Sequence, residues 1–352
     1  MNVLIVAGGT GGHLAPGLAL AAEFAAESKD QAVLLTLPQN ELSVARYGLP
    51  ERVSIELYTA PNLKRGLLDL LLLPMRLLRA LRQVRAVFAR HAVQVVVGLG
   101  GYPSLPALLY CRLFSVPYFL CEQNAMPGRI TRLFWKKARM VFLNFPVART
   151  PLRSMVVGNP VRSAIENKAS QHRRQPSKKP VVLVLGGSQG SAQINDLVLQ
   201  ALSLAGVRWL FQCGESQLAH VRSRLSAKGR EDVNLFGFHS DPAELYSQAD
   251  ILVCRAGAGV LSEALLYGLP MLLIPYPYAS DDHQKANAEV LVHAGAARML
   301  YGKTIDPALF VEVLTSMLND RPLLEDMSRK ARSMARPGVA RTIAGHIRSA
   351  HE

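Results

Sequence analysis

Short apolar runs alternate with longer amphipathic segments along most of the 352 residues. In the first half, the apolar runs predict strands at residues 2–7, 31–37, 53–58, 93–98, 117–121, 139–143 and 154–157. Several runs are apolar at successive positions, which is typical of parallel strands covered on both faces. A helix is expected from about Leu14 to Ser28. This alternation predicts an α/β domain with a doubly wound parallel sheet.

The same pattern restarts after a polar stretch. Residues 166–179 are polar and basic without apolar periodicity, so they predict a linker. Strands are then expected at 180–185, 207–212, 233–238, 250–253, 271–274 and 297–299, with helices that include 259–267 and 283–294. The tail at 321–351 has a helical pattern. We therefore expect a first domain at 1–165, a second at 180–335, and a C-terminal helix at 336–352 that could pack back on the first domain.

Two glycine-rich loops follow the first strand of each half. The sequence is GGTGGH at residues 8–13 and GGSQG at residues 186–190, and a helical pattern follows each loop. A tight glycine turn that opens into a helix exposes unpaired backbone N–H groups at the positive end of the helix dipole. Such a turn is suited to binding a phosphate or another anion. Two such loops predict two nucleotide-fold halves.

The net charge of the chain limits the kinds of molecule that it is expected to bind. The chain carries 40 Lys and Arg against 26 Asp and Glu, a formal net charge of +14. This balance favours an anionic partner: a nucleic acid, an anionic lipid surface or a phosphorylated substrate. Only 7% of the residues are aromatic, and no basic patch has aromatic residues interleaved, so a nucleic-acid binder is the less favoured class.

The spacing of the cysteines and the length of the apolar runs indicate the cellular compartment in which the protein is expected. The four cysteines have no metal-binding or CxxC spacing, which indicates buried thiols in a reducing compartment and no metal site. No secretory leader precedes the first strand, and no apolar run reaches the ~18 residues that a spanning helix needs. The expectation is a cytosolic protein without a membrane span.

The first glycine loop does not favour a dinucleotide dehydrogenase. That class needs an acidic residue at the tip of the second strand to bind the ribose hydroxyls. The second strand here ends Leu35-Thr36-Leu37-Pro38-Gln39, without an acid, and no P-loop GK[ST] occurs.

Two further segments follow strands of the second half. One is CRAGAGVLSEAL at 254–265, where small residues precede a helix and Glu263 lies near its start. A carboxylate there can accept hydrogen bonds from two ribose hydroxyls, although an acid near a helix start is also an ordinary stabilising feature. The other segment is DDHQKANA at 281–288, beyond a strand's carboxyl end, where open α/β sheets bind ligands. By itself it is an ordinary helix start.

Taken together, these segments resemble glycosyltransferase family 28, and within it the UDP-N-acetylglucosamine transferases of peptidoglycan synthesis. The matching motifs span nearly the whole chain: GGTGGH at 8–13 with PG at 16–17, GGYPS at 100–104, EQN at 122–124, VGNPVR at 157–162, GGSQGS at 186–191, residues 254–263, and DHQ at 282–284 with NA at 287–288. The resemblance implies a GT-B fold, in which two Rossmann-like domains face a cleft.

The resemblance also implies a reaction and its setting. N-acetylglucosamine would move from UDP-N-acetylglucosamine to the muramoyl 4-hydroxyl of lipid I, an undecaprenyl-diphosphate glycolipid, giving lipid II with inversion. The enzyme would serve cell-wall synthesis, cell shape and cell division as a peripheral protein on the cytoplasmic face of the inner membrane. It would need no cofactor and no bound metal, and the chain has no DxD motif.

Site residues carry over from the family motifs position by position. Those expected on the donor side are Thr10, Gly11, Gly12, Asn124, Arg162, Ser188, His239, Ala258, Gly259, Val260, Leu261, Ser262, Glu263 and Gln284. Ser188 and neighbouring amides would hold the diphosphate, Glu263 the ribose, and the backbone near His239 the uracil. Gly9, Gly101 and Tyr102 are expected on the acceptor side. Leu105, Cys121 and Val260 depart from the usual family residues and put local contacts in doubt.

His13 is the candidate general base, and Glu122 is the alternative. A sugar hydroxyl is a poor nucleophile at neutral pH, and an unperturbed histidine has a pKa of about 6.5, near the operating pH. His13 ends the first glycine loop. Its other interpretation is structural, as a histidine at a helix start that holds the loop by hydrogen bonds.

Residues 61–91 form a basic amphipathic stretch. A leucine-rich turn at 67–73 is followed by Pro74 and a helix in which Leu77, Leu81, Val84 and Phe88 share one stripe, with arginines at 76, 79, 82, 85 and 90 off it. The stretch is too short to span a bilayer. We expect the stripe to pack inward and the leucine-rich turn and arginines to contact an anionic membrane surface.

Two rival functions remain open at this stage. One is another GT-B enzyme, such as a different glycolipid glycosyltransferase or a UDP-sugar epimerase. The EQN and VGNPVR motifs favour the lipid I transferase over it. The other, from a different class, is a basic Rossmann-like nucleic-acid binder without catalysis.

Overall fold

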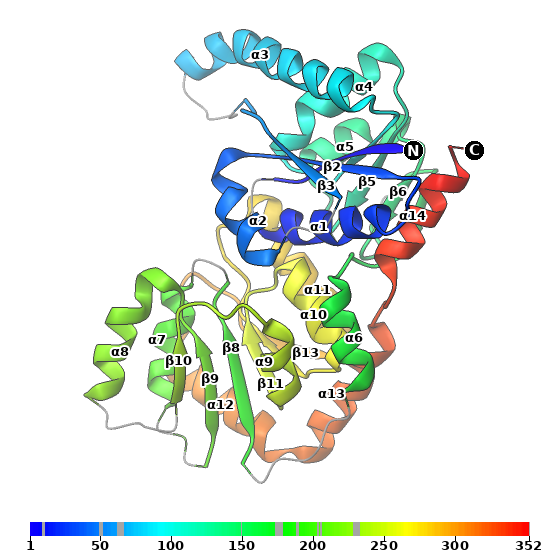
Figure 1. Ribbon diagram of the computed structural model, residues 1–352. Coiled ribbons are helices and arrows are strands. Elements are labelled where there is room, and N and C mark those ends of the chain that lie inside the picture. The colour runs from blue at the N-terminus through cyan, green and yellow to red at the C-terminus, as the bar shows by residue number, and fades with distance from the viewer. Residues whose placement is uncertain are drawn as a thin grey trace. The chain divides into compact units, whose positions relative to one another are not determined.

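The computed structural model describes residues 1–8, 11–48, 52–61, 67–148, 150–172, 179–187, 190–202, 204, 206–227 and 233–351. The chain divides into two compact units (Figure 1). Unit 1 comprises Met1–Ser163 with Gly338–Glu352, and unit 2 comprises Ala164–Pro337. Each unit is built around its own parallel sheet, so the expected pair of α/β domains is confirmed.

Unit 1 contains a seven-stranded sheet in the order β3-β2-β1-β4-β5-β6-β7. Its strands, all paired in parallel, are β1 (Asn2–Val6), β2 (Gln31–Thr36), β3 (Val53–Leu57), β4 (Val95–Gly98), β5 (Tyr118–Glu122), β6 (Val141–Leu143) and β7 (Ser154–Val156). Each lies within one or two residues of the strand that the apolar pattern predicts. In β1, Val3 and Ile5 enter one core while Leu4 and Val6 enter the other, so both faces of the strand are apolar.

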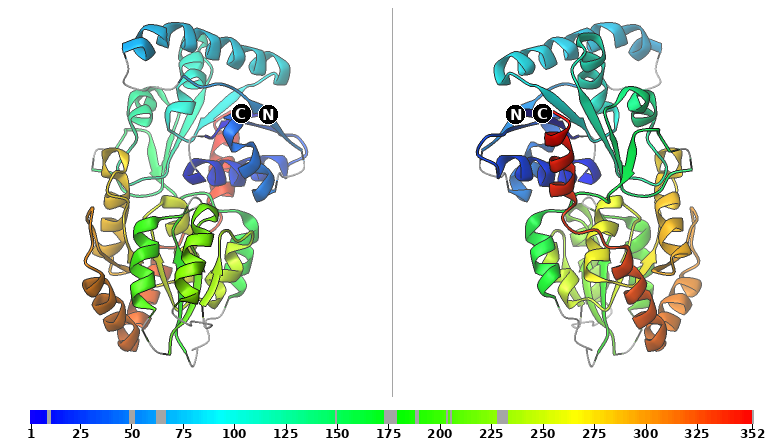
Figure 2. Two further views of the ribbon diagram at one scale, coloured as in Figure 1. Left: turned by 90° about the vertical axis from the view of Figure 1, so that its left-hand side faces the viewer. Right: turned by 90° about the vertical axis from the view of Figure 1, so that its right-hand side faces the viewer.

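Helices cover both faces of this sheet. They are α1 (Gly11–Ala25), α2 (Glu41–Tyr47), α3 (Leu67–His91), α4 (Leu105–Phe114), α5 (Arg129–Phe134) and α14 (Val339–Ser349), with short 3₁₀ helices at Pro38–Asn40, Tyr102–Ser104 and Trp135–Lys137. The last helix, α14, lies beside α1 (Figure 2), and its Ile343 and Ile347 are fully buried in the core that contains Phe24. Arg348 Nε donates to Asp30 at 2.7 Å, and Asp30 also accepts from the Met1 amino group.

Unit 2 contains a six-stranded parallel sheet in the order β10-β9-β8-β11-β12-β13. The strands are β8 (Val181–Leu185), β9 (Arg208–Gln212), β10 (Val233–Phe236), β11 (Ile251–Cys254), β12 (Met271–Leu273) and β13 (Ala297–Met299). The helices are α6 (Ser163–Gln171), α7 (Ala192–Ala201), α8 (Leu218–Ser226), α9 (Pro242–Gln248), α10 (Ala258–Tyr267), α11 (His283–His293), α12 (Pro307–Asn319) and α13 (Arg321–Met334), with 3₁₀ helices at Glu215–Gln217 and Ser280–Asp282. All six strands occur where the sequence predicts them.

The expected linker at 166–179 is wrong in its first part. Residues up to Gln171 belong to α6, which buries Ile165 and Ala169. The Tyr267 hydroxyl donates to the Ile165 carbonyl at 3.3 Å, and Lys168 pairs with Asp241, so α6 is integrated into unit 2. A nine-residue helix with two buried positions leaves too weak a period to detect. The remainder at 173–178 lies outside the described residues.

One other helical segment differs from expectation. Residues 67–73 are not a turn: they form the start of α3, which continues through Pro74 to His91. The tail at 321–351 is helical as expected and consists of α13 and α14, since Pro337 and Gly338 separate the two helices and Gly338 has a φ of +69°. Among the described residues, no helix is long and apolar enough to cross a membrane.

Candidate functional site

Each sheet has a point where the strand order reverses, between β1 and β4 in unit 1 and between β8 and β11 in unit 2. Strands β8 and β11 are labelled in Figure 1. The motifs at 8–13, 100–104, 186–191 and 254–263 follow these four strands or begin at their ends. The loops after these strands lie at the carboxyl edge of each sheet, the edge at which α/β folds commonly bind ligands. Their described residues are 7–8 and 99–101 in unit 1, and 186–187, 190–191 and 255–257 in unit 2. The described parts of both glycine-rich loops therefore lie at the carboxyl edges of the sheets.

His13 lies against the loop that follows β4. A Cβ added at Gly100 would lie 3.7 Å from His13 Nε2, and one at Gly101 would lie 3.7 Å from His13 Cε1. Both glycines have positive φ, 83° and 68°, and the Ser104 hydroxyl donates to the Gly100 carbonyl at 2.8 Å. The imidazole thus rests on a tightly turned backbone with its Nδ1 shielded from solvent. The helix start includes His13, since α1 begins at Gly11 rather than near Leu14.

Glu122, the alternative base, ends β5 and is buried. Its Oε1 accepts from the Asn124 backbone N–H at 3.1 Å and from Asn124 Nδ2 at 3.3 Å, while its Oε2 accepts from the Gly128 N–H at 3.0 Å. Both carboxylate oxygens therefore hold the loop between β5 and α5. This geometry favours a structural carboxylate over a proton acceptor for substrate.

The other expected residues of unit 1 are placed as follows. Gly12 is exposed on the first turn of α1 and Gly11 begins that helix; Gly9 and Thr10 lie outside the described residues. Tyr102 opens the 3₁₀ helix after Gly101 and packs on the core that contains α3 and α4. Arg162 is half-buried after β7.

The glycine loop of unit 2 is compact. A Cβ added at Gly190 would lie 2.2 Å from the Cys213 carbonyl oxygen, and one at Gly186 would lie 2.8 Å from the Ser191 nitrogen. The Gly190 N–H bonds the Gly187 carbonyl at 3.0 Å, closing the turn. Ser191 then caps α7, its hydroxyl accepting from the Ile194 N–H at 3.3 Å. Ser188, expected at the diphosphate, lies outside the described residues.

The second loop at this edge leads into α10, which carries six expected residues. Ala258 and Leu261 have buried side chains, so only their backbone can face a ligand. Glu263 is half-buried and its Oε2 accepts from the Tyr246 hydroxyl of α9 at 2.8 Å. This bond orients one of the two carboxylate oxygens of Glu263. Ser262 donates to the Ala258 carbonyl at 2.9 Å, while Gly259 and Val260 are half-buried on the first turn.

Gln284 lies on the first turn of α11, and His239 lies in the segment between β10 and α9. Gln284 Oε1 accepts from the Tyr276 N–H at 2.9 Å, which turns the amide nitrogen away from that backbone. His239 Nδ1 accepts from the Asp241 N–H at 3.2 Å, so the imidazole holds the loop before α9. Behind them Asn287, fully buried, donates to the Ala256 carbonyl at 3.0 Å and ties α11 to the loop after β11.

Sequence reasoning did not assign a role to Arg255. This half-buried residue follows β11 and bonds Ser191 and Gln193 of α7, at 2.7 and 2.9 Å. Its only signal in the sequence was its place between a buried strand and a run of small residues. Tyr246 was also missed, and Asn287 was noted only as part of the NA motif, because a buried polar residue has no local signature of the partner that it bonds.

Burial argues against thiol chemistry. It raises the pKa of Cys111 and of Cys121 to about 12, and raises the pKa of Cys254 further. Protonated thiols are poor nucleophiles and poor metal ligands. In the part of the chain that the structure describes, no cluster of His, Cys, Asp or Glu could hold a metal ion.

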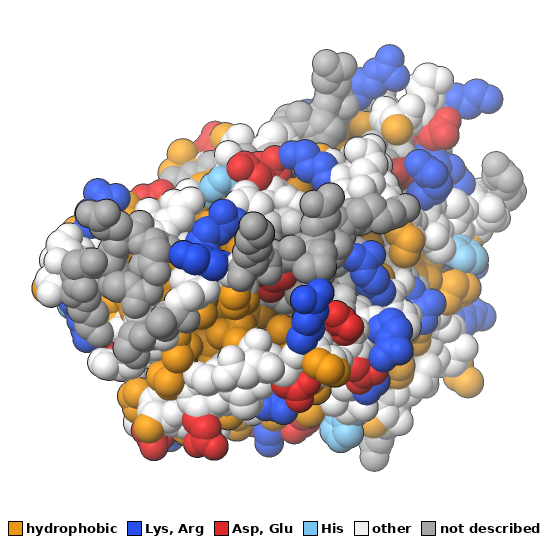
Figure 3. Space-filling view, turned by 90° about the horizontal axis from the view of Figure 1, so that it is seen from below, with side chains coloured by type: hydrophobic (Ala, Val, Ile, Leu, Met, Phe, Trp, Pro, Cys, Tyr) orange, Lys and Arg blue, Asp and Glu red, His pale blue; other side chains and the backbone are white. Residues whose placement is uncertain are grey.

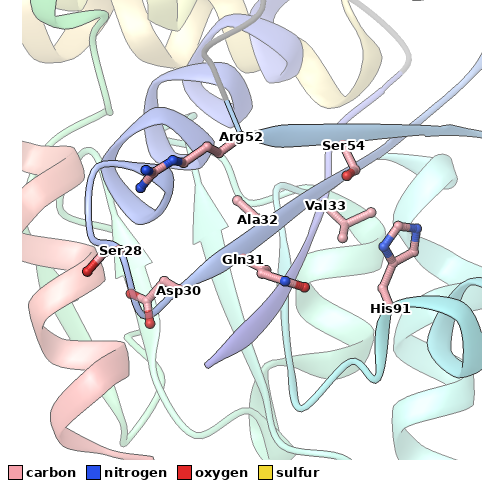
Figure 4. A pocket seen from close by; sticks show the side chains of 8 residues that line it. All are labelled: Ser28, Asp30, Gln31, Ala32, Val33, Arg52, Ser54 and His91. Carbon is pink, nitrogen blue, oxygen red and sulfur yellow. The ribbon is translucent and has the colours of Figure 1, made fainter.

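A cavity of about 360 Å³ lies at the opposite, amino edge of the unit 1 sheet (Figure 4). Gln31 of β2 and Ser54 of β3 line it together with His91, which ends α3. His91 Nε2 is 2.7 Å from Glu56 Oε1, so its imidazole is engaged in an ion pair or hydrogen bond. None of the expected site residues lines this cavity.

The excess of Lys and Arg over Asp and Glu does not make every face of the protein uniformly basic (Figure 3). On the face shown in Figure 3, seen from below the view of Figure 1, Lys and Arg side chains are interspersed with Asp and Glu. A mixed face of this kind does not present the single-sign field that a nucleic-acid groove needs.

Known proteins resemble this chain over nearly its whole length. The model of the glycosyltransferase family 28 N-terminal domain matches residues 3–143, and that of the C-terminal domain matches residues 181–343. A Shewanella baltica protein is 36% identical over 341 residues, which are 95% of this chain and 93% of the relative. It is named UDP-N-acetylglucosamine–N-acetylmuramyl-(pentapeptide) pyrophosphoryl-undecaprenol N-acetylglucosamine transferase.

Solved structures agree with this similarity. The crystal structure of Acinetobacter baumannii MurG has a TM-score of 0.79 at 28% identity and covers 99% of both chains. A UDP-N-acetylglucosamine 2-epimerase has a TM-score of 0.65 at 13% identity, with 98% of this chain and 94% of that one covered. The second likeness shows a shared fold alone.

Gly190→Ala tests the close approach in the unit 2 loop. The added Cβ would collide with the Cys213 carbonyl and strain a φ of +79°, so we expect a loss of roughly 2 kcal/mol or more in the free energy of unfolding. Denaturant unfolding measures it. Gly259→Ala is the matched control, because its Cβ would meet nothing within 4 Å, and its midpoint should not fall. Equal midpoints for the two variants would contradict the loop geometry.

Proposed function

We propose that this chain, which belongs to glycosyltransferase family 28, transfers N-acetylglucosamine from UDP-N-acetylglucosamine to the muramoyl 4-hydroxyl of undecaprenyl-diphosphate-linked lipid I. The product is lipid II, and the reaction inverts the anomeric centre. Its role is in peptidoglycan synthesis and thereby in cell shape and division. The observation that carries this proposal is the similarity to the Shewanella baltica transferase at 36% identity over 95% of the chain.

The donor binds at the carboxyl edge of the unit 2 sheet. The start of α7 and the start of α10 lie beside the switch point there and offer unpaired N–H groups to the diphosphate. Glu263, already oriented by Tyr246, accepts the ribose hydroxyls, and the backbone near His239 reads the uracil. Gln284 contacts the sugar through its amide nitrogen, since its oxygen is held by the Tyr276 N–H.

These groups also favour departure of the nucleotide. As the bond between the sugar C1 and the diphosphate oxygen breaks, negative charge grows on UDP. Fixed backbone N–H groups and the positive ends of two helix dipoles are oriented before the reaction starts, so they stabilise this charge without reorganising.

The acceptor hydroxyl is activated in unit 1, and His13 is the group suited to it. The 4-hydroxyl oxygen forms the new bond to C1 while its proton passes to the imidazole. His13 is held against the backbone of Gly100 and Gly101, which fixes its ring plane. Glu122 supports the neighbouring loop, because both of its oxygens accept hydrogen bonds from residues of that loop.

A membrane surface is the second partner, and α3 is the element that contacts it. Leu71, Met75 and Leu78 have exposed fractions of 70%, 69% and 50% and share one face of the helix, three and four residues apart. Arginines at 79, 82 and 85 are exposed nearby, while Val84 and Phe88 are buried in the core as the sequence predicts. An apolar stripe flanked by arginines suits the interface of an anionic leaflet, where a polyprenyl substrate resides.

The decisive test is release of UDP from UDP-N-acetylglucosamine with and without a lipid I analogue. We expect release that depends on the analogue and a product that carries one more N-acetylglucosamine. Release without the acceptor, with conversion of the free sugar nucleotide, would instead identify an epimerase or hydrolase. No reaction of either kind, with nucleic-acid binding in its place, would support the non-catalytic alternative.

His13→Ala tests the proton acceptor. We expect turnover to fall about 10²–10⁴-fold while the affinity for UDP stays within a few-fold, because the donor binds in unit 2. Initial rates with the lipid I analogue and calorimetric titration with UDP measure the two quantities. Turnover within several-fold of the unaltered protein would show that His13 is not the base. Glu122→Gln should lower the unfolding midpoint as well as the rate, which distinguishes a loop support from a catalytic group.

The triple variant Leu71→Gln, Met75→Gln and Leu78→Gln tests the membrane contact. It keeps good helix formers and all the arginines, so co-sedimentation with phosphatidylglycerol vesicles should fall several-fold through loss of apolar insertion alone. Leu42→Gln is the control, since Leu42 is 76% exposed on a different helix, α2. Undiminished co-sedimentation of the triple variant would exclude this face of α3 as the contact.

A further inference from the structure

Arg255 links the loops that follow three neighbouring strands of unit 2. Its Nη2 donates to Ser191 Oγ at 2.7 Å and its Nη1 to Gln193 Oε1 at 2.9 Å, both at the start of α7. Nη1 also donates to the carbonyl oxygens of Ile274 and Pro275, at 3.0 and 3.3 Å, beyond the end of β12. Because Arg255 itself follows β11, one side chain crosses the switch point between β8 and β11.

The Ser191 hydroxyl can still donate one hydrogen bond, because its oxygen already accepts two. It accepts from the Ile194 N–H and from the Arg255 guanidinium, and a hydroxyl oxygen has two acceptor lone pairs. Its remaining capacity is to donate its proton. Among the residues that the structure describes, no acceptor is found for that proton, and the side chain is only 7% exposed. A buried O–H at the first turn of α7 is thus oriented by its two donors and available to an incoming acceptor.

The charge of Arg255 is not neutralised locally. Burial lowers the pKa of its guanidinium, but an arginine side chain stays protonated in proteins. Its hydrogen-bond partners are neutral oxygens, and within the described parts of the chain no carboxylate pairs with it. A cation held only by neutral groups at this edge favours an anionic ligand in its neighbourhood.

A closed ring of contacts fixes the guanidinium from its other side. Arg255 lies 5.5 Å from the Tyr276 ring centre, and the Tyr276 and Tyr278 centres are 5.7 Å apart. Lys303 lies 5.7 Å from the Tyr278 ring centre, and its carbonyl accepts from Gln193 Nε2 at 3.2 Å. Since Gln193 accepts from Arg255, the ring is complete. Side chains constrained on both sides lose little further entropy when a ligand binds.

We propose that Arg255 is a positioning residue of the donor site, which fixes the Ser191 hydroxyl as a hydrogen-bond donor to the diphosphate of the nucleotide sugar. This inference rests on the proposed function, since it takes the nucleotide to bind at the start of α7. It assigns Ser191 as a direct diphosphate contact and Arg255 as the group that acts through it. Arg255 contributes the orientation of Ser191 rather than a phosphate contact of its own.

Calorimetric titration with UDP and with uridine tests this assignment. Arg255→Met and Ser191→Ala should each weaken UDP binding about tenfold and leave uridine binding within twofold, because only UDP carries the diphosphate. The double variant should bind UDP no more weakly than Arg255→Met, since both changes remove one contact. Arg255→Lys restores the charge but not the planar fork, so it should not restore UDP affinity.

Arg208→Met is the control for net charge, because Arg208 begins β9 at the opposite edge of the same sheet. Ser191→Ala keeps the assignment testable if Arg255→Met does not fold, since it removes only a hydroxyl. Additive losses in the double variant, full rescue by lysine, or equal losses for uridine would overturn the proposal. Absence of UDP binding by the unaltered protein would instead overturn the proposed function, and this inference with it.

Discussion

Tightly turned glycine backbone at the carboxyl edge of each sheet is the constraint on which the rest depends. In unit 2, Gly190 passes so near the Cys213 carbonyl that no side chain fits between them. This turn brings Ser191 to the start of α7, where its hydroxyl accepts from the Ile194 N–H and caps the helix. In unit 1, Gly100 and Gly101 turn with positive φ and provide the surface on which His13 rests. These glycines therefore determine where Ser191 and His13 lie.

In the proposed function, the two switch points use the same kind of scaffold for different chemistry. At the edge in unit 2, Arg255 is held by neutral oxygens, an arrangement that the proposal relates to the diphosphate. The edge in unit 1 carries the His13 imidazole at the start of α1 and, at the end of β5, the Glu122 carboxylate, whose oxygens accept hydrogen bonds from its own loop. A site that binds a diphosphate needs fixed positive charge, whereas a site that takes up a proton needs a group whose pKa lies near the operating pH. In this proposal both units supply the same scaffold, and a few side chains at each edge determine whether it binds the diphosphate or accepts the proton.

The strands were predictable because parallel strands are apolar on both faces. Leu4 and Val6 face one core and Val3 and Ile5 the other, so the run stands out without any partner being known. The start of α6 was not predictable, since only Ile165 and Ala169 are buried in it. The motif residues could be placed on loops from the sequence. Their partners could not, because contacts such as that between Arg255 and Ser191 join positions 64 residues apart.

Placement of hydrogen-bond partners also separates two residues that the sequence left as alternatives. Glu122 and His13 both lie at the carboxyl edge of one sheet, and either side chain could accept a proton in principle. Glu122 has its two oxygens bonded to Asn124 and Gly128, so protonating it would remove support from its own loop. His13 lies against the backbone of Gly100 and Gly101, at the start of α1. The proposed function therefore takes His13 as the proton acceptor and Glu122 as the support of its own loop, because a base must be able to gain a proton without losing the contacts that hold its surroundings.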